Sequence, residues 1–433
     1  MGKKALVLGG GGAKGSYEMG TWCAFNELGK EWDIVTGTSI GSLNGAMVAE
    51  GNFQKAEHIW KNIDFEKIFH ENEEDVPRIE STLDIVRFCL SDALTEGSFD
   101  TRELYDVIRE NIDEEKIRNS KTRLGIMTVE VPSLKPWALM IDDIPKGLLP
   151  DFLLASSSCF PVFKPWKIGD KIFIDGGYYD NLPVNLAIDA GAEDIVAVDL
   201  EAVGFNKLTK KREYPILTIK PYWNLGSLLD FEQSGYERNK ALGYNDTMKA
   251  YGLMEGMFFT FKKGEEQINK ERLRHQIGRA EKTIDQMLLR PVSRAVQTLD
   301  TKSVNGFLGQ GSFLCDPADM LTRMAEMAGI VYRLTPTKVY TFREFNRKLL
   351  MEYLKFGGVI DNIKSLDIQV SGILSAIGKA LDNRTVTALM TEMLLKEKSL
   401  SESMWTIAEI MPREFASAVY ISALVDAMGI EPK

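Results

Sequence analysis

The first half of the chain alternates short apolar runs with segments of helical periodicity. The apolar runs lie at 5–8, 34–36, 124–129, 172–174, 195–198 and 216–219. Runs like these are typical of strands buried on both faces of a mostly parallel sheet. Segments with helical periodicity lie between them at 16–28, 42–50, 101–112 and 184–190. Because parallel strands need helical crossovers, the alternation predicts an α/β fold.

The pattern changes after about residue 261, where strand-like runs nearly vanish and helical periodicity takes over. One charged helix is predicted over 265–290. Further on, Thr341 and Glu344 have the spacing of a capping box, which marks a helix start. We therefore predict two parts, an α/β domain over residues 1–262 and a helical C-terminal region over 263–433 of unknown role.

Composition excludes several classes of function. The chain of 433 residues has a formal net charge of −10, which argues against general nucleic-acid binding because phosphate neutralisation needs a basic surface. Its four cysteines form no CxxC pair and its three histidines form no HExxH motif, so we expect neither a disulfide framework nor a metal site. A reducing, cytoplasmic location fits this cysteine usage.

The apolar stretches are too short for membrane insertion. The one near the N-terminus, at 5–8, falls short of the ~7–15 apolar residues of a signal peptide. No run approaches the ~20 residues of a membrane span. We expect a strand at the N-terminus, and any membrane contact is expected to be peripheral.

A glycine-rich segment, GGGGAKG at 9–15, lies between a predicted strand and a predicted helix. Its backbone N–H groups and the helix N-terminus create positive potential, so we expect a negatively charged group there. Gly10, Gly12 and Gly15 fit the GxGxxG pattern of dinucleotide binding, and the same loop fits an oxyanion hole. Both interpretations stay open. A Walker A loop is excluded because neither Ser nor Thr directly follows Lys14.

A second motif, GTSIG at 37–41, follows the strand-like DIVT and precedes a predicted helix. This is the strand, sharp turn and helix in which a nucleophilic serine is held. Gly37 and Gly41 permit neighbouring elements to approach the strained serine closely. The context predicts that Ser39 is a nucleophile.

A serine hydroxyl needs a base, and the usual base is histidine. The chain offers only His58, His70 and His275. Their polar or charged surroundings are typical of surface histidines. The better candidate is Asp175, which ends the strand KIFID and precedes Gly176 and Gly177. These glycines leave room for another group to approach the carboxylate, although Asp–Gly alone indicates only a turn.

Four segments together resemble the patatin-like phospholipase family, especially its bacterial members. They are ALVLGGGGAKGSYEMG, GTSIGSLNGA, ASSSCFPVF and IDGGYYDNLPV. They occur in the family's order with similar spacing, and the resemblance covers roughly residues 4–260. It implies a three-layer α/β/α core with a mostly parallel sheet, and it makes residues 1–262 a patatin-like catalytic domain.

The resemblance also implies roles for particular residues. Ser39 would be the nucleophile and Asp175 the base of a Ser–Asp dyad, which accounts for the scarcity of histidine. Gly11 and Gly12 would offer backbone N–H groups to an oxyanion, with Gly10 shaping the turn. Lys14 stands where the family often has arginine, a change that keeps the charge and loses bidentate geometry.

The substrate pocket and a basic cluster are less sharply indicated. Phe160, Phe163 and Trp166 are candidate walls for an acyl chain, and ordinary core packing would use the same residue types. A basic cluster is formed by Lys207, Lys210, Lys211 and Arg212. It fits either anionic lipid headgroups or a solvated loop.

We therefore predict a serine hydrolase that cleaves acyl esters of phospholipids or other lipids through an acyl-enzyme, with no metal or organic cofactor. A non-lipolytic carboxylesterase and an acyltransferase would use the same dyad. A dinucleotide-binding oxidoreductase is a rival, with Asp33 near the distance of a ribose-binding acid. A catalytically silent lipid-binding protein is a further alternative. The expected partner is a lipid or ester substrate, with no nucleic acid.

Overall fold

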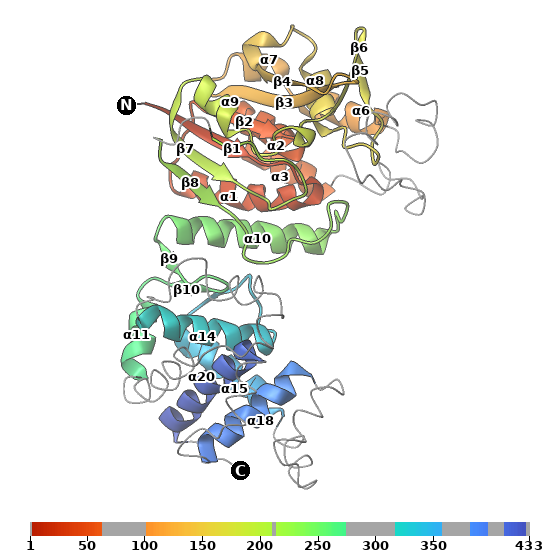
Figure 1. Ribbon diagram of the computed structural model, residues 1–433. Coiled ribbons are helices and arrows are strands. Elements are labelled where there is room, and N and C mark those ends of the chain that lie inside the picture. The colour runs from red at the N-terminus through yellow and green to blue at the C-terminus, as the bar shows by residue number, and fades with distance from the viewer. Residues whose placement is uncertain are drawn as a thin grey trace. The chain divides into compact units, whose positions relative to one another are not determined.

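The computed structural model describes residues 2–62, 101–209, 214–273, 317–356, 382–396 and 411–429. Close packing divides the chain into two compact units, residues 1–251 and 252–433. Figure 1 shows the elements of both units with their labels. The boundary at 262/263 stays a prediction about domain organisation.

An eight-stranded sheet forms the centre of the first unit, in the order β5-β6-β3-β2-β1-β7-β8, with β4 paired to β3. The strands are β1 (Lys3–Leu8), β2 (Ile34–Thr38), β3 (Arg123–Val131), β4 (Lys135–Met140), β5 (Trp166–Ile168), β6 (Lys171–Asp175), β7 (Ala192–Val198) and β8 (Ile216–Ile219). Every apolar run singled out in the first half of the sequence is a strand. β4 and β5 were not predicted. Lys167 interrupts the apolar residues of the short strand β5, and Pro136 makes the apolar run of β4 a weak strand signal.

Strands β3, β2, β1, β7 and β8 pair in parallel, whereas β4, β6 and β5 join the sheet antiparallel. Helices cover both faces. Leu6 and Leu8 of β1 pack in one core with the helices that follow β1 and β2. Ala5 and Val7 pack on the other face against the helix over 184–189. The predicted α/β fold with a mostly parallel sheet between helical layers is confirmed.

The helices of this unit connect and cover the strands. They are α1 (Ser16–Glu27), α2 (Ile40–Glu50), α3 (Phe53–Asn62), α6 (Arg102–Asn111), α7 (Glu114–Arg118), α8 (Leu149–Ser157), α9 (Val184–Asp189) and α10 (Gln233–Ala250), with short 3₁₀ turns at Gly12–Gly15, Ile141–Asp143 and Gly176–Tyr178. α1 and α2 each directly follow the strand that positions them, as the sequence predicts.

Two helical glycines set the distance between α1 and α10, which lie side by side (Figure 1). A Cβ on Gly20 of α1 would lie 1.9 Å from the carbonyl oxygen of Lys240, and one on Gly243 of α10 would lie 2.0 Å from that of Tyr17. Tyr17 also donates a buried 2.8 Å hydrogen bond to Asp246. Backbone contact at this distance is available only to glycine.

The second unit is mainly helical, as predicted. Its elements are β9 (Met254–Glu255), β10 (Thr260–Lys262), α11 (Glu265–Arg272), α14 (Pro317–Val331), β11 (Val339–Tyr340), α15 (Phe342–Leu354), α18 (Asn383–Lys396) and α20 (Pro412–Met428). The charged helix predicted over 265–290 ends at Arg272 in the structure, and residues from 274 to 290 lie outside the described part. Thr341 accepts a hydrogen bond from the Glu344 N–H, so it is the N-cap that the sequence indicates.

β9 and β10 join this unit through pairing that only tertiary structure reveals, because β10 pairs with β11 across almost eighty positions of sequence. The buried Glu326 carboxylate accepts hydrogen bonds from the N–H groups of Met257 and Phe259. Aromatic rings of Phe259, Phe345 and Tyr340 pack together beside it. None of the helices that the structure describes is both long and apolar enough to cross a membrane.

Gly243→Ala should lower the free energy of unfolding by ~1–3 kcal/mol, because the new Cβ overlaps the α1 backbone. Gly235→Ala is the matched control in the same helix, since its nearest neighbour would be at 3.8 Å, and it should raise stability by ~0.5–1 kcal/mol. Urea denaturation of both variants measures the difference. Equal stability of the two would contradict close α1–α10 packing.

Candidate active site

The register of β3 brings Ser39 and Asp175 together. β2 runs parallel to β3 and ends with Thr38 beside Met127. β6 runs antiparallel along the same edge of β3 and ends with Asp175 beside Thr128, the next residue. The two strands therefore meet head to head, so the residue after β2 and the last residue of β6 share one point on the sheet edge.

Ser39 lies at a strained turn between β2 and α2, with φ 55° and ψ −129°. Its backbone N–H donates to the Ser156 hydroxyl at 3.0 Å, and that hydroxyl donates in turn to the Met127 carbonyl at 2.7 Å. A residue other than glycine with such backbone angles costs on the order of 1–3 kcal/mol and persists only where surrounding contacts hold it. The backbone at Ser39 is thus fixed from the β3 side.

Gly37 and Gly41 make the turn sterically accessible. A Cβ on Gly37 would lie 2.1 Å from the Gly41 carbonyl oxygen, and one on Gly41 would lie 2.5 Å from the Leu8 carbonyl oxygen. Because these neighbours are backbone atoms, they cannot move aside as a flexible side chain could. The glycine requirement at both positions therefore comes from close approach to β1 and to the turn itself.

Asp175 is buried, with 4% of its surface exposed. Its carboxylate accepts hydrogen bonds from the Ser39 hydroxyl and from the Gly177 N–H at 2.7 Å. Burial raises the pKa of the Asp175 carboxyl to about 6, and the two hydrogen bonds partly oppose that rise. At neutral pH the carboxylate is ionised and faces a serine hydroxyl, as a proton acceptor must.

Gly176 and Gly177 permit this geometry through contacts with different neighbours. A Cβ on Gly176 would lie 2.3 Å from the Met127 carbonyl oxygen. One on Gly177 would lie 3.1 Å from the Asp175 carboxylate and 2.9 Å from Asn181 Oδ1. A side chain at Gly176 would therefore collide with β3, and one at Gly177 would collide with Asn181 and the carboxylate itself.

The glycine-rich loop follows β1 and lies beside Ser39, since Leu8 is paired with Gly37. The Gly10 N–H donates to the Asn181 carbonyl at 3.0 Å, so this amide is occupied and Gly10 cannot itself donate to an oxyanion. For the amides of Gly11 and Gly12, no acceptor is found in the part of the chain that the structure describes. Both residues line the same cavity as Ser39.

Asn181 is a site residue that sequence reasoning missed. Its side-chain amide donates to the Gly10 carbonyl at 3.2 Å, and its backbone N–H donates to the Phe205 carbonyl at 2.6 Å. It therefore links the glycine-rich loop to the turn after β6 and to the loop that contains Phe205. Its position within IDGGYYDNLPV was a usable signal, because that segment also contains Asp175.

A cavity of about 740 Å³ opens at Ser39 and Asp175, within the ~300–1,000 Å³ range of ligand sites. Phe163 lines it, as predicted. Phe160 and Trp166 do not. Phe160 is buried in a separate core against β3 and β6, and Trp166 packs on Tyr105 with its indole N–H bound to Asp151. The expectation that these two form the pocket wall is corrected, because each ring is already enclosed elsewhere.

Two helices provide much of the cavity lining. From α2 come Ile40, Leu43, Asn44 and Met47, and from α6 come Leu104, Val107, Ile108 and Asn111. Each set has the i, i+3, i+4, i+7 spacing of one helix face. Met47 lies eight residues beyond Ser39, or about 12 Å along α2 at ~1.5 Å per residue. The cavity therefore extends deeply along α2.

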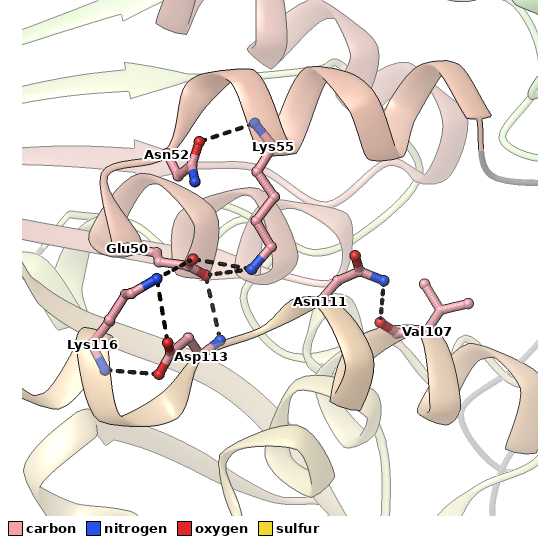
Figure 2. Close-up of polar contacts among 7 residues, drawn as sticks. All are labelled: Glu50, Asn52, Lys55, Val107, Asn111, Asp113 and Lys116. Atoms are coloured by element: carbon pink, nitrogen blue, oxygen red, sulfur yellow. Dashed lines mark hydrogen bonds and ion pairs between the residues drawn. The ribbon is translucent and has the colours of Figure 1, made fainter.

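A polar cluster at the far end ties α6 to α2 (Figure 2). The Glu50 carboxylate, at the C-terminus of α2, accepts from Lys55 at 3.0 Å and from the Asp113 N–H at 3.4 Å. Lys116 approaches the same carboxylate at 3.8 Å. Asp113 directly follows Ile112, the lining residue just after α6. These contacts therefore hold the end of α6 against the helix that starts after Ser39.

The remaining sequence candidates lie outside this site. His58 is exposed on α3 and contacts Asn62, whereas His70 and His275 lie outside the described residues. Asp33 precedes β2 at the end opposite Ser39, where its carboxylate accepts from the Lys4 N–H at 2.8 Å. The ribose-binding role considered for it is therefore wrong, because the glycine-rich loop lies at the other end of the strands. Of the basic cluster only Lys207 is described, with its ammonium 3.9 Å from the centre of the Tyr179 ring.

Comparison with known proteins points to one family. Residues 6–188 match the model of the family described as patatin-like phospholipase. A human protein named patatin-like phospholipase domain-containing protein 6 is 29% identical over 204 residues, covering 45% of this chain and 13% of that protein. A lysophospholipase of Aspergillus terreus is 28% identical over 202 residues, covering 46% of this chain and 12% of that protein.

The chain thus matches only about an eighth of the length of these curated relatives. Among solved structures, VipD from Legionella pneumophila aligns over 96% of this chain and 92% of its own, with 13% identity and a TM-score of 0.40. A likeness at that level has no bearing on the activity of this chain.

Asp175→Asn should stabilise the protein at pH 8 by ~2 kcal/mol, because it removes a buried charge. The raised pKa means that the folded wild type binds its proton more tightly than the unfolded chain does. Its stability therefore falls as pH rises from about 4 through about 6, and the gap between variant and wild type should close as pH is lowered through that window. Urea denaturation at several pH values tests this, with Asp170→Asn at an exposed turn as control. A gap that does not change with pH would contradict the buried charge.

Proposed function

We propose that this protein is a lipid acyl hydrolase of the patatin-like phospholipase family, whose model residues 6–188 match, with Ser39 as nucleophile and Asp175 as base. The observation that carries the proposal is the hydrogen bond from the Ser39 hydroxyl to the buried Asp175 carboxylate, where both residues line a largely apolar cavity. We assign catalysis to the predicted domain of residues 1–262.

In the first step, Ser39 Oγ attacks the ester carbonyl as its proton passes to Asp175. The C–O bond to the alcohol then breaks, and the alcohol leaves with that proton. In the second step, a water molecule gives a proton to Asp175 and attacks the acyl carbonyl. The fatty acid is released, and the proton returns to Ser39.

The tetrahedral intermediates carry an oxyanion that needs hydrogen-bond donors. The amides of Gly11 and Gly12 are suited to this role, since no acceptor for them is found among the described residues and both residues line the cavity. Gly10 acts through turn geometry, with its amide bound to Asn181. Because a carboxylate is a weak base towards a serine hydroxyl, these donors must lower much of the barrier.

The cavity lining supports an acyl chain as the group bound. Asp175 is the sole carboxylate, and lysine, arginine and histidine are missing, among the described residues of the lining. A phosphate group would find no cation there, whereas an aliphatic chain would contact the apolar faces of α2 and α6. We therefore propose that the acyl chain enters the cavity and that the headgroup stays outside it.

We further propose that the protein works in the cytoplasm and contacts membranes from the surface. The free thiols of Cys23 and Cys159 support a reducing compartment. The substrate class supports the membrane contact, since long-chain lipid esters reside in membranes.

Ser39→Ala and Asp175→Asn should each reduce fatty-acid release by at least ~10³-fold, because the covalent step needs both groups. The assay supplies phospholipid, lysophospholipid and glyceride in mixed micelles and identifies products by mass spectrometry. Ser133→Ala, on an exposed turn between β3 and β4, is the control and should keep wild-type activity. The proposal fails if either dyad variant retains normal release.

Substitutions along α2 should shorten the acyl chains that the enzyme accepts. Met47 lies about 12 Å beyond Ser39 and Leu43 about 6 Å, and a zigzag chain with ~1.5 Å bonds advances ~1.25 Å per carbon. Met47→Trp should therefore lower kcat/KM for chains longer than ~10 carbons by about 10-fold. Leu43→Trp should move the cutoff to about half that length.

The measurement compares kcat/KM over a series of p-nitrophenyl esters whose acyl chains have roughly four to sixteen carbons. The two variants control for each other, since both add an indole to the same helix face. An identical cutoff in both would show that the chain does not run along α2. Thermal unfolding checks that each variant is folded.

A further inference from the structure

Three large apolar side chains project into solvent from one loop, residues 201–209. Val203 is 91% exposed, Phe205 61% and Leu208 84%. They are the most exposed large hydrophobic side chains of the described residues. Clustered exposure of this kind is unfavourable in water and marks a surface that contacts another apolar phase.

The loop borders the proposed active site. Val203, Gly204 and Phe205 line the cavity that contains Ser39 and Asp175. The Phe205 N–H donates to the Gly177 carbonyl at 3.0 Å, and its carbonyl accepts from Asn181. The exposed side chains are therefore attached directly to the turn that follows the base.

Further hydrogen bonds hold the rest of the loop. The Lys207 N–H donates to the Asp180 carboxylate at 3.2 Å, and the Asn185 side chain donates to the Leu208 carbonyl at 3.1 Å. Together with the two bonds of Phe205, they hold the backbone from Phe205 to Leu208. The apolar side chains face solvent from an anchored backbone, so their exposure is a built feature of the fold.

We propose that residues 201–209 are an interfacial docking loop that inserts Val203, Phe205 and Leu208 into the surface of a lipid bilayer. The inference rests on the proposed function, because it supplies the route by which a membrane lipid reaches Ser39. Docking there places the cavity mouth at the bilayer, so an acyl chain passes from lipid to protein without crossing water.

The chemistry of the loop matches a lipid surface better than a protein partner. Apolar side chains enter the acyl region. The positive charge of Lys207, which lies between Phe205 and Leu208 and packs on the Tyr179 ring, favours anionic lipid nearby. Continuity with the cavity gives the second argument, since two of the three inserted side chains also line the path to the dyad. A protein bound at this position would cover the cavity mouth.

The first test measures binding without turnover. Full-length Ser39→Ala protein is floated with vesicles of phosphatidylcholine alone or with phosphatidylglycerol. The triple substitution Val203→Ser, Phe205→Ser and Leu208→Ser should weaken partitioning at least ~10-fold. Met351→Ser with Leu354→Ser is the matched control, since both are 55% exposed on α15, and it should bind as the parent does.

The second test measures activity with Leu208→Ser alone, because Leu208 does not line the cavity. This variant should hydrolyse a monomeric short-chain ester at the wild-type rate and vesicle phospholipid several-fold more slowly. Equal vesicle binding by parent and triple variant, or a parent that does not bind, overturns the docking loop. Loss of all ester hydrolysis in wild type would overturn the proposed function instead, and the flotation result would still decide the loop.

Discussion

The site depends on one arrangement in the sheet, the head-to-head meeting of β2 and β6 along a single edge of β3. A parallel strand and an antiparallel strand share that edge, and their C-terminal ends fall beside Met127 and Thr128. Because strand pairing is held by a continuous ladder of backbone hydrogen bonds, the separation of the two ends is fixed by register. A hydroxyl and a carboxylate far apart in sequence are thereby held within hydrogen-bonding distance on rigid elements.

Glycines at this junction serve close packing of backbone on backbone. Gly41 lies against the end of β1, Gly176 against β3, and Gly37 against the Gly41 carbonyl. The same crowding excludes water from Asp175 and raises its pKa to about 6. Dense packing therefore stabilises the turn. It also makes the Asp175 carboxylate more basic than usual, although the carboxylate is still ionised at neutral pH. The buried charge costs stability that the surrounding sheet supplies.

The cavity for the substrate is also positioned by the elements that hold the dyad. α2 begins directly after Ser39, so its apolar face leads away from the nucleophile, and Glu50 at its far end bonds to Asp113, which follows the second lining helix, α6. At the mouth, the loop of residues 201–209 is bonded to the turn after Asp175. Contacting elements thus position the nucleophile, the acyl site and the proposed membrane contact. A displacement of one element would therefore displace the others.

The sequence by itself determined the α/β class, the strands with continuous apolar runs and the importance of Ser39 and Asp175 as candidates, because these depend on local pattern and short motifs. Tertiary structure alone decided that Phe160 belongs to a core and Phe163 to the cavity, since both have the same residue chemistry and differ only in what surrounds them. It also decided that the Gly10 amide is occupied, that Asn181 joins three loops, and that residues 254–262 pair with β11. Each of these is a contact between distant segments, and such contacts leave no periodic signal in the chain.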